Sequence, residues 1–221
     1  MKPVRAVIFD VYHTLLAVGA GPADADARWV DLWRSFLGTA PGLPLTEFDQ
    51  SCRTVVEEDH AMKKPAGVNW PEVDWRRVAT RAAGELSGLA DAPLDAFLYG
   101  HARLARTTTA MPGAAAFLTE IRHRGILTGI ASNAQRYTLT ELAAAGIPAE
   151  GFAEDLGFWS YQQGFSKPDP AVFAWLGERL AARGILPEEG LMIGDRLDND
   201  IQPAQAAGWQ TWHFQGKWPA I

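Results

Sequence analysis

Residues 4–16 read VRAVIFDVYHTLL, and this stretch decides the fold. Its first part, Val4–Ile8, is a short run rich in β-branched residues, which is typical of a parallel strand buried on both faces. The run ends at Phe9-Asp10, and polar residues follow it. Ligands bind at the carboxyl ends of the strands in an open α/β sheet, so Asp10 is a candidate for chemistry. The alternative is a carboxylate that only caps a turn or a helix.

The composition limits the classes of function. The chain has 221 residues, enough for one large domain or for a core domain that carries a smaller one. A net charge of −6 argues against a nucleic-acid-binding face and against a surface that attracts anionic lipid. No apolar run approaches the length of a membrane helix, and a single cysteine, Cys52, fits a reducing compartment. We therefore expect a cytoplasmic monomer or homodimer with no nucleic-acid or membrane partner.

Four amphipathic patterns follow the first strand, after a Gly- and Ala-rich stretch at 17–22 that is typical of a linker. Three of them span about 24–37, 46–62 and 93–104, and the other begins near Pro71. Amphipathic helices with short connections predict a helical bundle. We therefore predict a helical cap domain at 17–108, inserted into a core domain made of 1–16 and 109–221.

The α/β pattern resumes after the insertion. Strands are expected at 126–131, 152–158, 190–193 and 209–214, and helices at 114–123, 136–145, 170–182 and 201–207. Alternation of strands and helices is typical of a parallel sheet covered by helices. The predicted fold class is α/β, with a Rossmann-like parallel sheet core and an inserted α-helical bundle as the cap.

Polar residues follow several of these strands. One strand ends in Ser132-Asn133, another ends in Gly194-Asp195, and Lys167 stands in a loop before a helix. In a parallel sheet the carboxyl ends of the strands lie on one edge. A carboxylate, a hydroxyl, an ammonium group and a second carboxylate are therefore expected to converge there.

Four motifs in this order resemble those of the haloacid dehalogenase-like superfamily of hydrolases. They are DVYHTL at 10–15, the strand ending at Ser132, Lys167 in SKPDP, and GDRLDND at 194–200. The helical insertion directly after the first motif matches the position of the cap in one subfamily. Each motif alone is unspecific, whereas four with this order and spacing are specific to the superfamily. They are much less specific to one reaction.

The resemblance implies that Asp10 is a nucleophile that forms a covalent aspartyl intermediate. It also implies a Mg²⁺ site formed by the Asp10 and Asp195 carboxylates and the backbone carbonyl of Tyr12, because hard oxygen ligands suit this ion. The cation and Lys167 would neutralise charge between the nucleophile and a small phosphorylated substrate. The implied catalytic positions are Asp10, Tyr12, Ser132 and Lys167. Substrate contacts are implied for Ser132, Asn133 and Lys167, and supporting positions are Thr14 and Asp200.

The sequence departs from the family's phosphatases at Tyr12. Those enzymes usually carry a second aspartate two residues after the nucleophile, which protonates the leaving group and then activates water. Loss of a general acid lowers the rate by about 10²–10⁴-fold. A phenol titrates near pH 10, so it is a poor replacement. His13 has a better intrinsic pKa but lies one residue further on. A good leaving group, such as an acyl phosphate, would need the missing acid least.

Two alternatives follow from this departure. Tyrosine at position 12 is typical of the family's 2-haloacid dehalogenases, which need no metal ion. Against that alternative, Asp195 keeps the acidic, metal-binding form of the fourth motif, and carboxylates near Asp10 are unfavourable without a cation. We therefore predict a Mg²⁺-dependent phosphatase in which Tyr12 replaces the usual general acid. A metal-independent 2-haloacid dehalogenase and a weakly active or non-catalytic binding protein of the same fold remain as alternatives.

Overall fold

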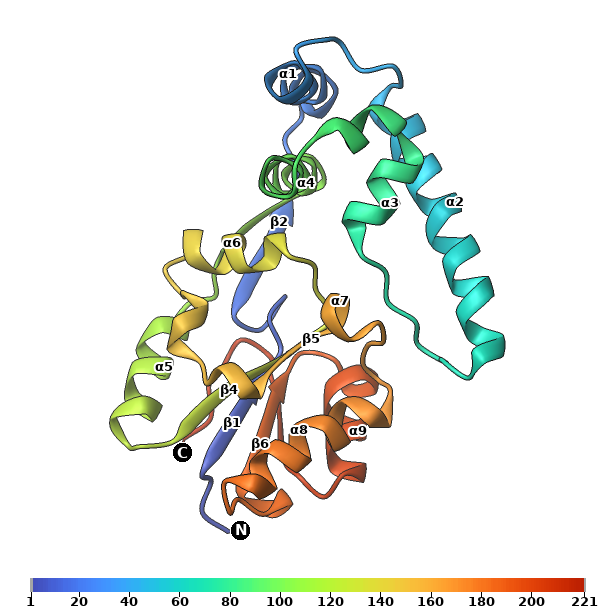
Figure 1. Ribbon diagram of the computed structural model, residues 1–221. Helices are drawn as coiled ribbons and strands as arrows, with labels where there is room; N and C mark the ends of the chain where they lie inside the picture. The colour runs from blue at the N-terminus through green and yellow to red at the C-terminus, as the bar shows by residue number, and fades with distance from the viewer. Residues whose placement is uncertain (1, 221) are drawn as a thin grey trace.

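The computed structural model describes residues 2–220, apart from the side chain of Ala66, and its centre is a five-stranded parallel sheet (Figure 1). The strand order is β5-β4-β1-β6-β7, which places the first strand of the chain in the middle. All four pairings are parallel, as the sequence predicted. The strands are β1 (Ala6–Phe9), β4 (Leu127–Ser132), β5 (Gly157–Trp159), β6 (Gly190–Gly194) and β7 (Gln210–His213).

Helices cover both faces of the sheet. Side chains alternate between the two faces of a strand, so Val7 and Phe9 of β1 pack on one side and Ala6 and Ile8 on the other. The first side is covered by α5 (Ala114–His123) and α6 (Tyr137–Ala144), and the second by α8 (Pro170–Ala182) and α9 (Gln202–Ala206). Burial on both faces explains the unbroken apolar run in β1.

Four further helices lie between β2 (Leu16–Ala20) and β3 (Arg106–Ala110), and Figure 1 shows them above the sheet. They have their own apolar core, in which Trp29, Trp33 and Phe97 are almost fully buried. We call this part the cap. Within residues 2–220, no helix is both long and apolar enough to cross a membrane. The cap helices are α1 (Ala25–Leu37), α2 (Leu45–Lys63), α3 (Trp75–Ala82) and α4 (Asp91–Ala105).

The stretch expected to be a linker at 17–22 is mostly strand, and that expectation was wrong. β2 pairs antiparallel with β3, from Leu16 opposite Ala110 to Ala20 opposite Arg106. Position 21 needs glycine because two backbone segments pass close together there: a Cβ at Gly21 would lie 2.3 Å from the carbonyl oxygen of Leu104. The chain therefore enters and leaves the cap through one two-stranded ladder.

Two other expectations also differ from the structure. The strand expected at 152–158 is limited to β5, because residues 154–156 form a 3₁₀ turn before it. The third cap helix begins at Trp75 rather than near Pro71, because the Asp74 side chain accepts a hydrogen bond from the Arg76 backbone N–H and caps the helix there. Pro71 instead lies in an extended segment that contacts the core.

Candidate active site

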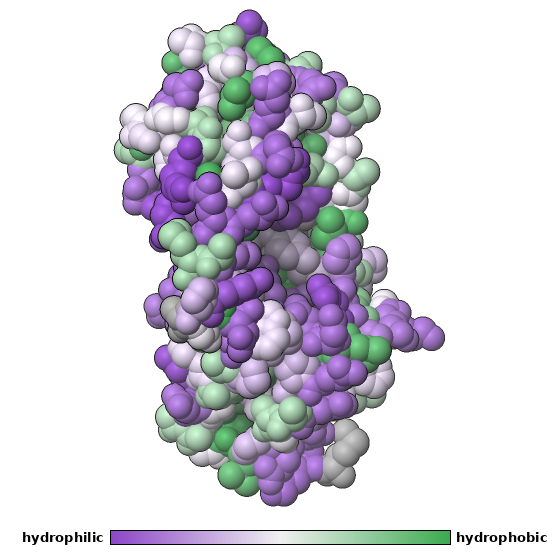
Figure 2. Space-filling view, turned by 90° about the vertical axis from the view of Figure 1, so that its right-hand side faces the viewer, coloured by the Kyte–Doolittle hydropathy of each residue, from purple (hydrophilic) through white to green (hydrophobic). Residues whose placement is uncertain are grey.

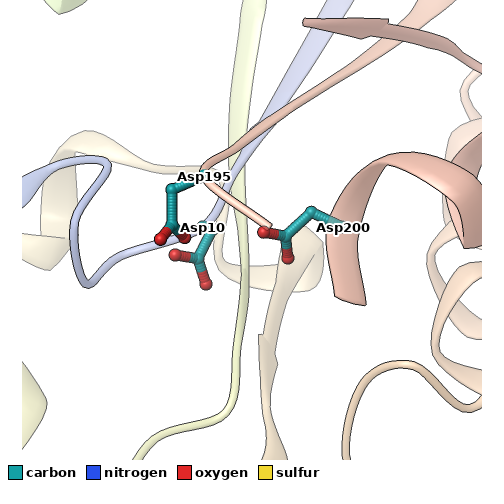
Figure 3. Close-up of side chains that lie close together, drawn as sticks. All are labelled: Asp10, Asp195 and Asp200. Carbon is teal, nitrogen blue, oxygen red and sulfur yellow. The ribbon is translucent and has the colours of Figure 1, made fainter. Parts of the chain in front are cut away.

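The carboxyl ends of the strands bring the polar residues together at the edge of the sheet that faces the cap (Figure 1). Asp10 follows β1 directly, Ser132 is the last residue of β4, and Asp195 follows β6. Figure 3 shows the carboxylates of Asp10, Asp195 and Asp200 turned toward one another. One oxygen from each of the three lies within 4.8 Å of the others. The convergence expected for Asp10 and Asp195 is therefore present, and Asp200 joins it.

Lys167 bridges two of these carboxylates. Its Nζ lies 2.7 Å from Asp10 Oδ1 and 2.5 Å from Asp200 Oδ1, and its side chain is fully buried. Burial alone would lower the pKa of Lys167, but the two carboxylates outweigh it and raise the pKa. The lysine therefore stays charged and compensates one of the three negative charges.

The remaining negative charge is unfavourable without a further cation. Burial raises the pKa of Asp10 to about 7, with added repulsion from Asp200 and Asp195 and with Lys167 opposing the rise. Burial and the charge of Asp200 also raise the pKa of Asp195. A divalent cation would reverse both effects, and carboxylate oxygens are ligands that Mg²⁺ prefers. The residues present therefore fit a Mg²⁺ site.

The GDRLDND motif folds so that Asp200 returns to the strand end. A Cβ at Gly194 would lie 2.4 Å from Asp200 Cγ, so only glycine leaves room for this carboxylate. The backbone N–H of Arg196 donates to Asp200 Oδ2 at 3.1 Å. Residues 197–201 form a wide helical turn that carries Asp200 back toward Lys167.

Three further predicted site residues differ in whether their side chains have hydrogen-bond partners: Ser132, Asn133 and Thr14. In the described part of the chain, Ser132 Oγ and Thr14 Oγ1 are buried without a hydrogen-bond partner. An unpaired buried hydroxyl is unfavourable, and a ligand oxygen would satisfy Ser132. The Asn133 amide is already engaged, because Nδ2 donates to the Lys167 carbonyl and Oδ1 accepts from the Lys167 N–H, both at 2.8 Å. Asn133 therefore holds the loop of Lys167.

Tyr12 belongs to a polar cluster that the sequence did not reveal. Its hydroxyl donates to Glu141 Oε2 at 2.5 Å, lies 2.7 Å from Thr138 Oγ1 and accepts from Arg106 Nη2 at 2.8 Å. The Arg106 guanidinium also lies 4.4 Å from the centre of the Tyr12 ring. Burial raises the pKa of Tyr12 well above its usual range, although the charge of Arg106 opposes this. The phenol is thus held neutral, with its donor and both acceptor positions in use.

His13, next to Tyr12, has a left-handed backbone conformation with φ of 61°. Its N–H donates to the Leu16 carbonyl at 2.6 Å, which closes the turn after β1. The backbone of His13 therefore has a structural role in this turn.

The surface is hollowed between the two parts of the molecule. Figure 2 shows this hollow at the waist, with the cap above it and the sheet domain below. The edge of the sheet that carries Asp10 faces the cap across this waist. A small molecule entering there would meet side chains from both parts.

Comparisons with known proteins agree with this arrangement. A family model described as haloacid dehalogenase-like hydrolase matches residues 4–208. Phosphoserine phosphatase of Thermus thermophilus is 38% identical over 98 residues, which are 44% of this chain and 37% of that protein. Glyceraldehyde 3-phosphate phosphatase of Pyrococcus furiosus is 31% identical over 112 residues, 50% of this chain and 45% of that protein. The matched segments thus span less than half the length of these curated relatives.

Solved structures share the fold over nearly the whole chain. A 2-haloacid dehalogenase from Pseudomonas syringae matches with a TM-score of 0.57 and 21% identity, over 94% of this chain and 85% of that chain. A phosphatase from Thermococcus onnurineus matches with a TM-score of 0.53 and 20% identity, over 94% of this chain and 85% of that chain. Because these neighbours catalyse different reactions, the fold alone does not choose between them.

Proposed function

Because this chain belongs to the haloacid dehalogenase-like hydrolase family, we propose that it is a Mg²⁺-dependent phosphatase of a small phosphorylated metabolite. The observation that carries the proposal is the cluster of Asp10, Asp195 and Asp200 around Lys167. Three carboxylates and one ammonium group leave an excess of two negative charges, which one divalent cation would balance. The phosphatase names of the relatives support the same choice.

Asp10 is the proposed nucleophile. Its carboxylate oxygen attacks the phosphorus atom, an aspartyl phosphate forms, and the bond from phosphorus to the leaving oxygen breaks with its electron pair on that oxygen. Water then attacks the same phosphorus atom, loses a proton to solvent, and releases inorganic phosphate with return of the Asp10 carboxylate. Lys167 holds the attacking carboxylate in place at 2.7 Å, and the unpaired Ser132 hydroxyl is available for a phosphoryl oxygen.

The Mg²⁺ ion would be held by Asp10, Asp195 and the backbone carbonyl of Tyr12, and would supply positive charge against the phosphoryl oxygens. Asp200 acts through Lys167, which it contacts at 2.5 Å. The ionised form of Asp10 is the nucleophile, so a cation that lowers its raised pKa also makes it reactive near neutral pH.

The leaving group is proposed to depart without a proton from Tyr12. The phenol is neutral, its proton is donated to Glu141, and its pKa is raised. Substrates whose leaving oxygen is stable as an anion, such as acyl or aryl phosphates, need no general acid. We therefore propose an acyl phosphate or a similarly activated phosphate as the substrate class.

One observation favours a second candidate, a metal-independent 2-haloacid dehalogenase. Position 12 is tyrosine, as expected for that activity, and a halide leaves without protonation. In this alternative Asp10 attacks the carbon that carries the halogen, and no cation takes part. The retained Asp195 and its raised pKa weigh against it.

The test is the release of phosphate from an aryl phosphate and of chloride from 2-chloropropionate, each with Mg²⁺ and with a chelator. Phosphate release that requires Mg²⁺ and is lost in Asp10→Asn supports the proposal. Chloride release that persists with the chelator, without phosphate release, would replace it with the dehalogenase. If neither product forms, the third alternative, a weakly active or non-catalytic binding protein of this fold, is favoured.

A further inference from the structure

Residues 70–73 of the cap, which we call the strap, are bonded directly to the core. Pro71 pairs with Phe165 in an isolated antiparallel bridge. The backbone N–H of Glu72 donates to the Gly164 carbonyl, and the N–H of Ser166 donates to the Trp70 carbonyl, both at 3.0 Å. In Figure 1 the segment leads into α3 on the side of the core where α7 (Ser160–Gln163) lies. The strap thus contacts the loop that leads to Lys167.

The Glu72 side chain extends these contacts to two other core loops. Its Oε2 accepts a hydrogen bond from Ser160 Oγ at 2.7 Å, and its Oε1 accepts one from Gln135 Nε2 at 3.2 Å. Gln135 Nε2 also donates to the Val73 carbonyl at 2.9 Å. Ser160 and Gln135 are both buried, so a carboxylate of the cap is hydrogen-bonded to buried side chains of the core. Such charge-assisted hydrogen bonds are the stronger ones.

Ser160 connects Glu72 to the loop that presents Ser132. The Ala134 backbone N–H donates to Ser160 Oγ at 2.9 Å, and Ala134 is two residues after Ser132. A serine hydroxyl has one proton, and donation to Glu72 leaves its lone pairs for the Ala134 N–H. Without Glu72, that proton can turn to the Ala134 carbonyl, which lies 3.3 Å away. The orientation of Ser160 therefore depends on the carboxylate of the cap.

The same loop is joined to Lys167. Asn133 lies between Ser132 and Ala134, and its amide makes two 2.8 Å hydrogen bonds with the backbone of Lys167. A shift of Ala134 is therefore expected to move Ser132, two residues earlier, and also Lys167, whose ammonium group contacts Asp10.

We propose that Glu72 is a positioning residue for the hydrolysis, acting through Ser160 to hold the 132–135 loop in its reactive arrangement; this rests on the function proposed above. Docking of the strap on the core then helps to order the site. It fixes Ser132 and Lys167 relative to the nucleophile, so a cap that is not docked leaves the site incompletely ordered.

The test compares Mg²⁺-dependent aryl phosphate hydrolysis in Glu72→Ala, Ser160→Ala and the double variant. Each single change is expected to lower kcat/KM roughly 10- to 100-fold, the range that corresponds to loss of one hydrogen bond to a charged group. Because both residues act through one path, the double variant should be no worse than the poorer single variant. Glu72→Gln keeps one acceptor oxygen and should retain more activity than Glu72→Ala. Glu57→Ala, an exposed position on α2, is the matched control.

Hydrogen exchange gives a second readout that does not need activity. Peptides covering 131–137 and 160–167 should exchange faster in Glu72→Ala than in Glu57→Ala, while peptides of β1 and β6 should not change. Activity and exchange equal to those of the control would overturn the proposal, and so would additive losses in the double variant. If the wild-type protein hydrolyses no phosphate, the proposed function fails, and the exchange pattern still decides the positioning role. The isosteric Glu72→Gln variant keeps the strap packed should the alanine variant fail to fold.

Discussion

Asp10→Asn is expected to abolish hydrolysis and yet make the metal-free protein more stable at pH 8. The Asp10 carboxylate is only 9% exposed and lies beside Asp195 and Asp200, with Lys167 as its compensating charge. A nucleophile placed among like charges is held there at the expense of folding free energy. A neutral amide of the same size removes that repulsion together with the reactive group.

The magnitude follows from the raised pKa of Asp10, about 7 in the folded protein against about 3.9 in an unfolded chain. At about 1.4 kcal/mol per pKa unit, ionising Asp10 in the folded state costs about 4 kcal/mol. The attraction of Lys167 for the ionised carboxylate is already part of that shift, so it is not subtracted again. The neutral amide is therefore expected to raise the free energy of unfolding by up to about 4 kcal/mol at pH 8.

The sign of the pH dependence follows from the same shift. The folded-state pKa of Asp10 lies above the unfolded value, so its contribution to stability is fully present below about pH 4 and is lost as the pH rises through about 7. The stability advantage of Asp10→Asn over wild type should therefore shrink as the pH falls from 8 to 5. Added Mg²⁺ should stabilise wild type more than the variant at pH 8.

Urea unfolding followed by tryptophan fluorescence at pH 8 and pH 5, with a chelator, measures these differences. Asp31→Asn, an exposed aspartate on α1, is the control and should change stability little at either pH. A variant less stable than wild type at pH 8 would refute the electrostatic reasoning. A stability difference that is the same at both pH values would refute it as well.

Three further outcomes are expected. Asp195→Asn should raise the Mg²⁺ concentration needed for half-maximal activity by about tenfold or more, because the cluster loses a carboxylate; an unchanged metal titration would place the cation elsewhere. Tyr12→Asp is combined with Glu141→Gln, so that the number of buried carboxylates around position 12 stays the same. This double variant should speed alkyl phosphate hydrolysis far more than aryl phosphate hydrolysis. Equal effects on both substrates would mean that the protein does not lack a general acid. Cys52 is buried with a pKa raised by burial to about 12, so it should not react with thiol reagents at pH 8 until the protein unfolds, and rapid labelling of the native protein would contradict its packing in the cap.

The main lines of the fold and the convergence of polar residues at one edge of the sheet could be predicted because they depend on local patterns and one topological rule. A short apolar run that ends in Asp10 predicts a buried strand with a polar residue at its carboxyl end. Parallel strands align these ends, so Asp10, Ser132 and Asp195 reach one edge of the sheet although they are far apart in sequence. The role of Asp200 beside Lys167 came from the family resemblance, and the geometry agrees with it.

The long-range contacts around the site had no such local signal. Tyr12 and Glu141 are separated by 129 residues, and Glu72 and Ser160 by 88, and neither pair has a spacing that marks it. The β2–β3 ladder was missed for a different reason. A Gly- and Ala-rich stretch looks flexible in sequence. In the structure, position 21 is glycine because the backbone at Leu104 leaves no room for a side chain. Sequence patterns therefore predicted which polar residues meet at the sheet edge better than the contacts that hold them in place.

The cluster around Tyr12 connects the residues at the sheet edge to the strands that join cap and core. Arg106 stands at the start of β3, the strand by which the chain returns from the cap, and its guanidinium lies between the Tyr12 ring and Glu141 of α6. A residue that transfers protons must change its protonation state during the reaction, but the Tyr12 hydroxyl has every hydrogen-bonding position filled and a raised pKa. Tyr12 therefore connects the loop of Asp10 to the β2–β3 ladder that joins cap and core. On the function proposed above, hydrolysis should depend on leaving groups that depart as stable anions, and its rate should fall steeply as the leaving group becomes more basic.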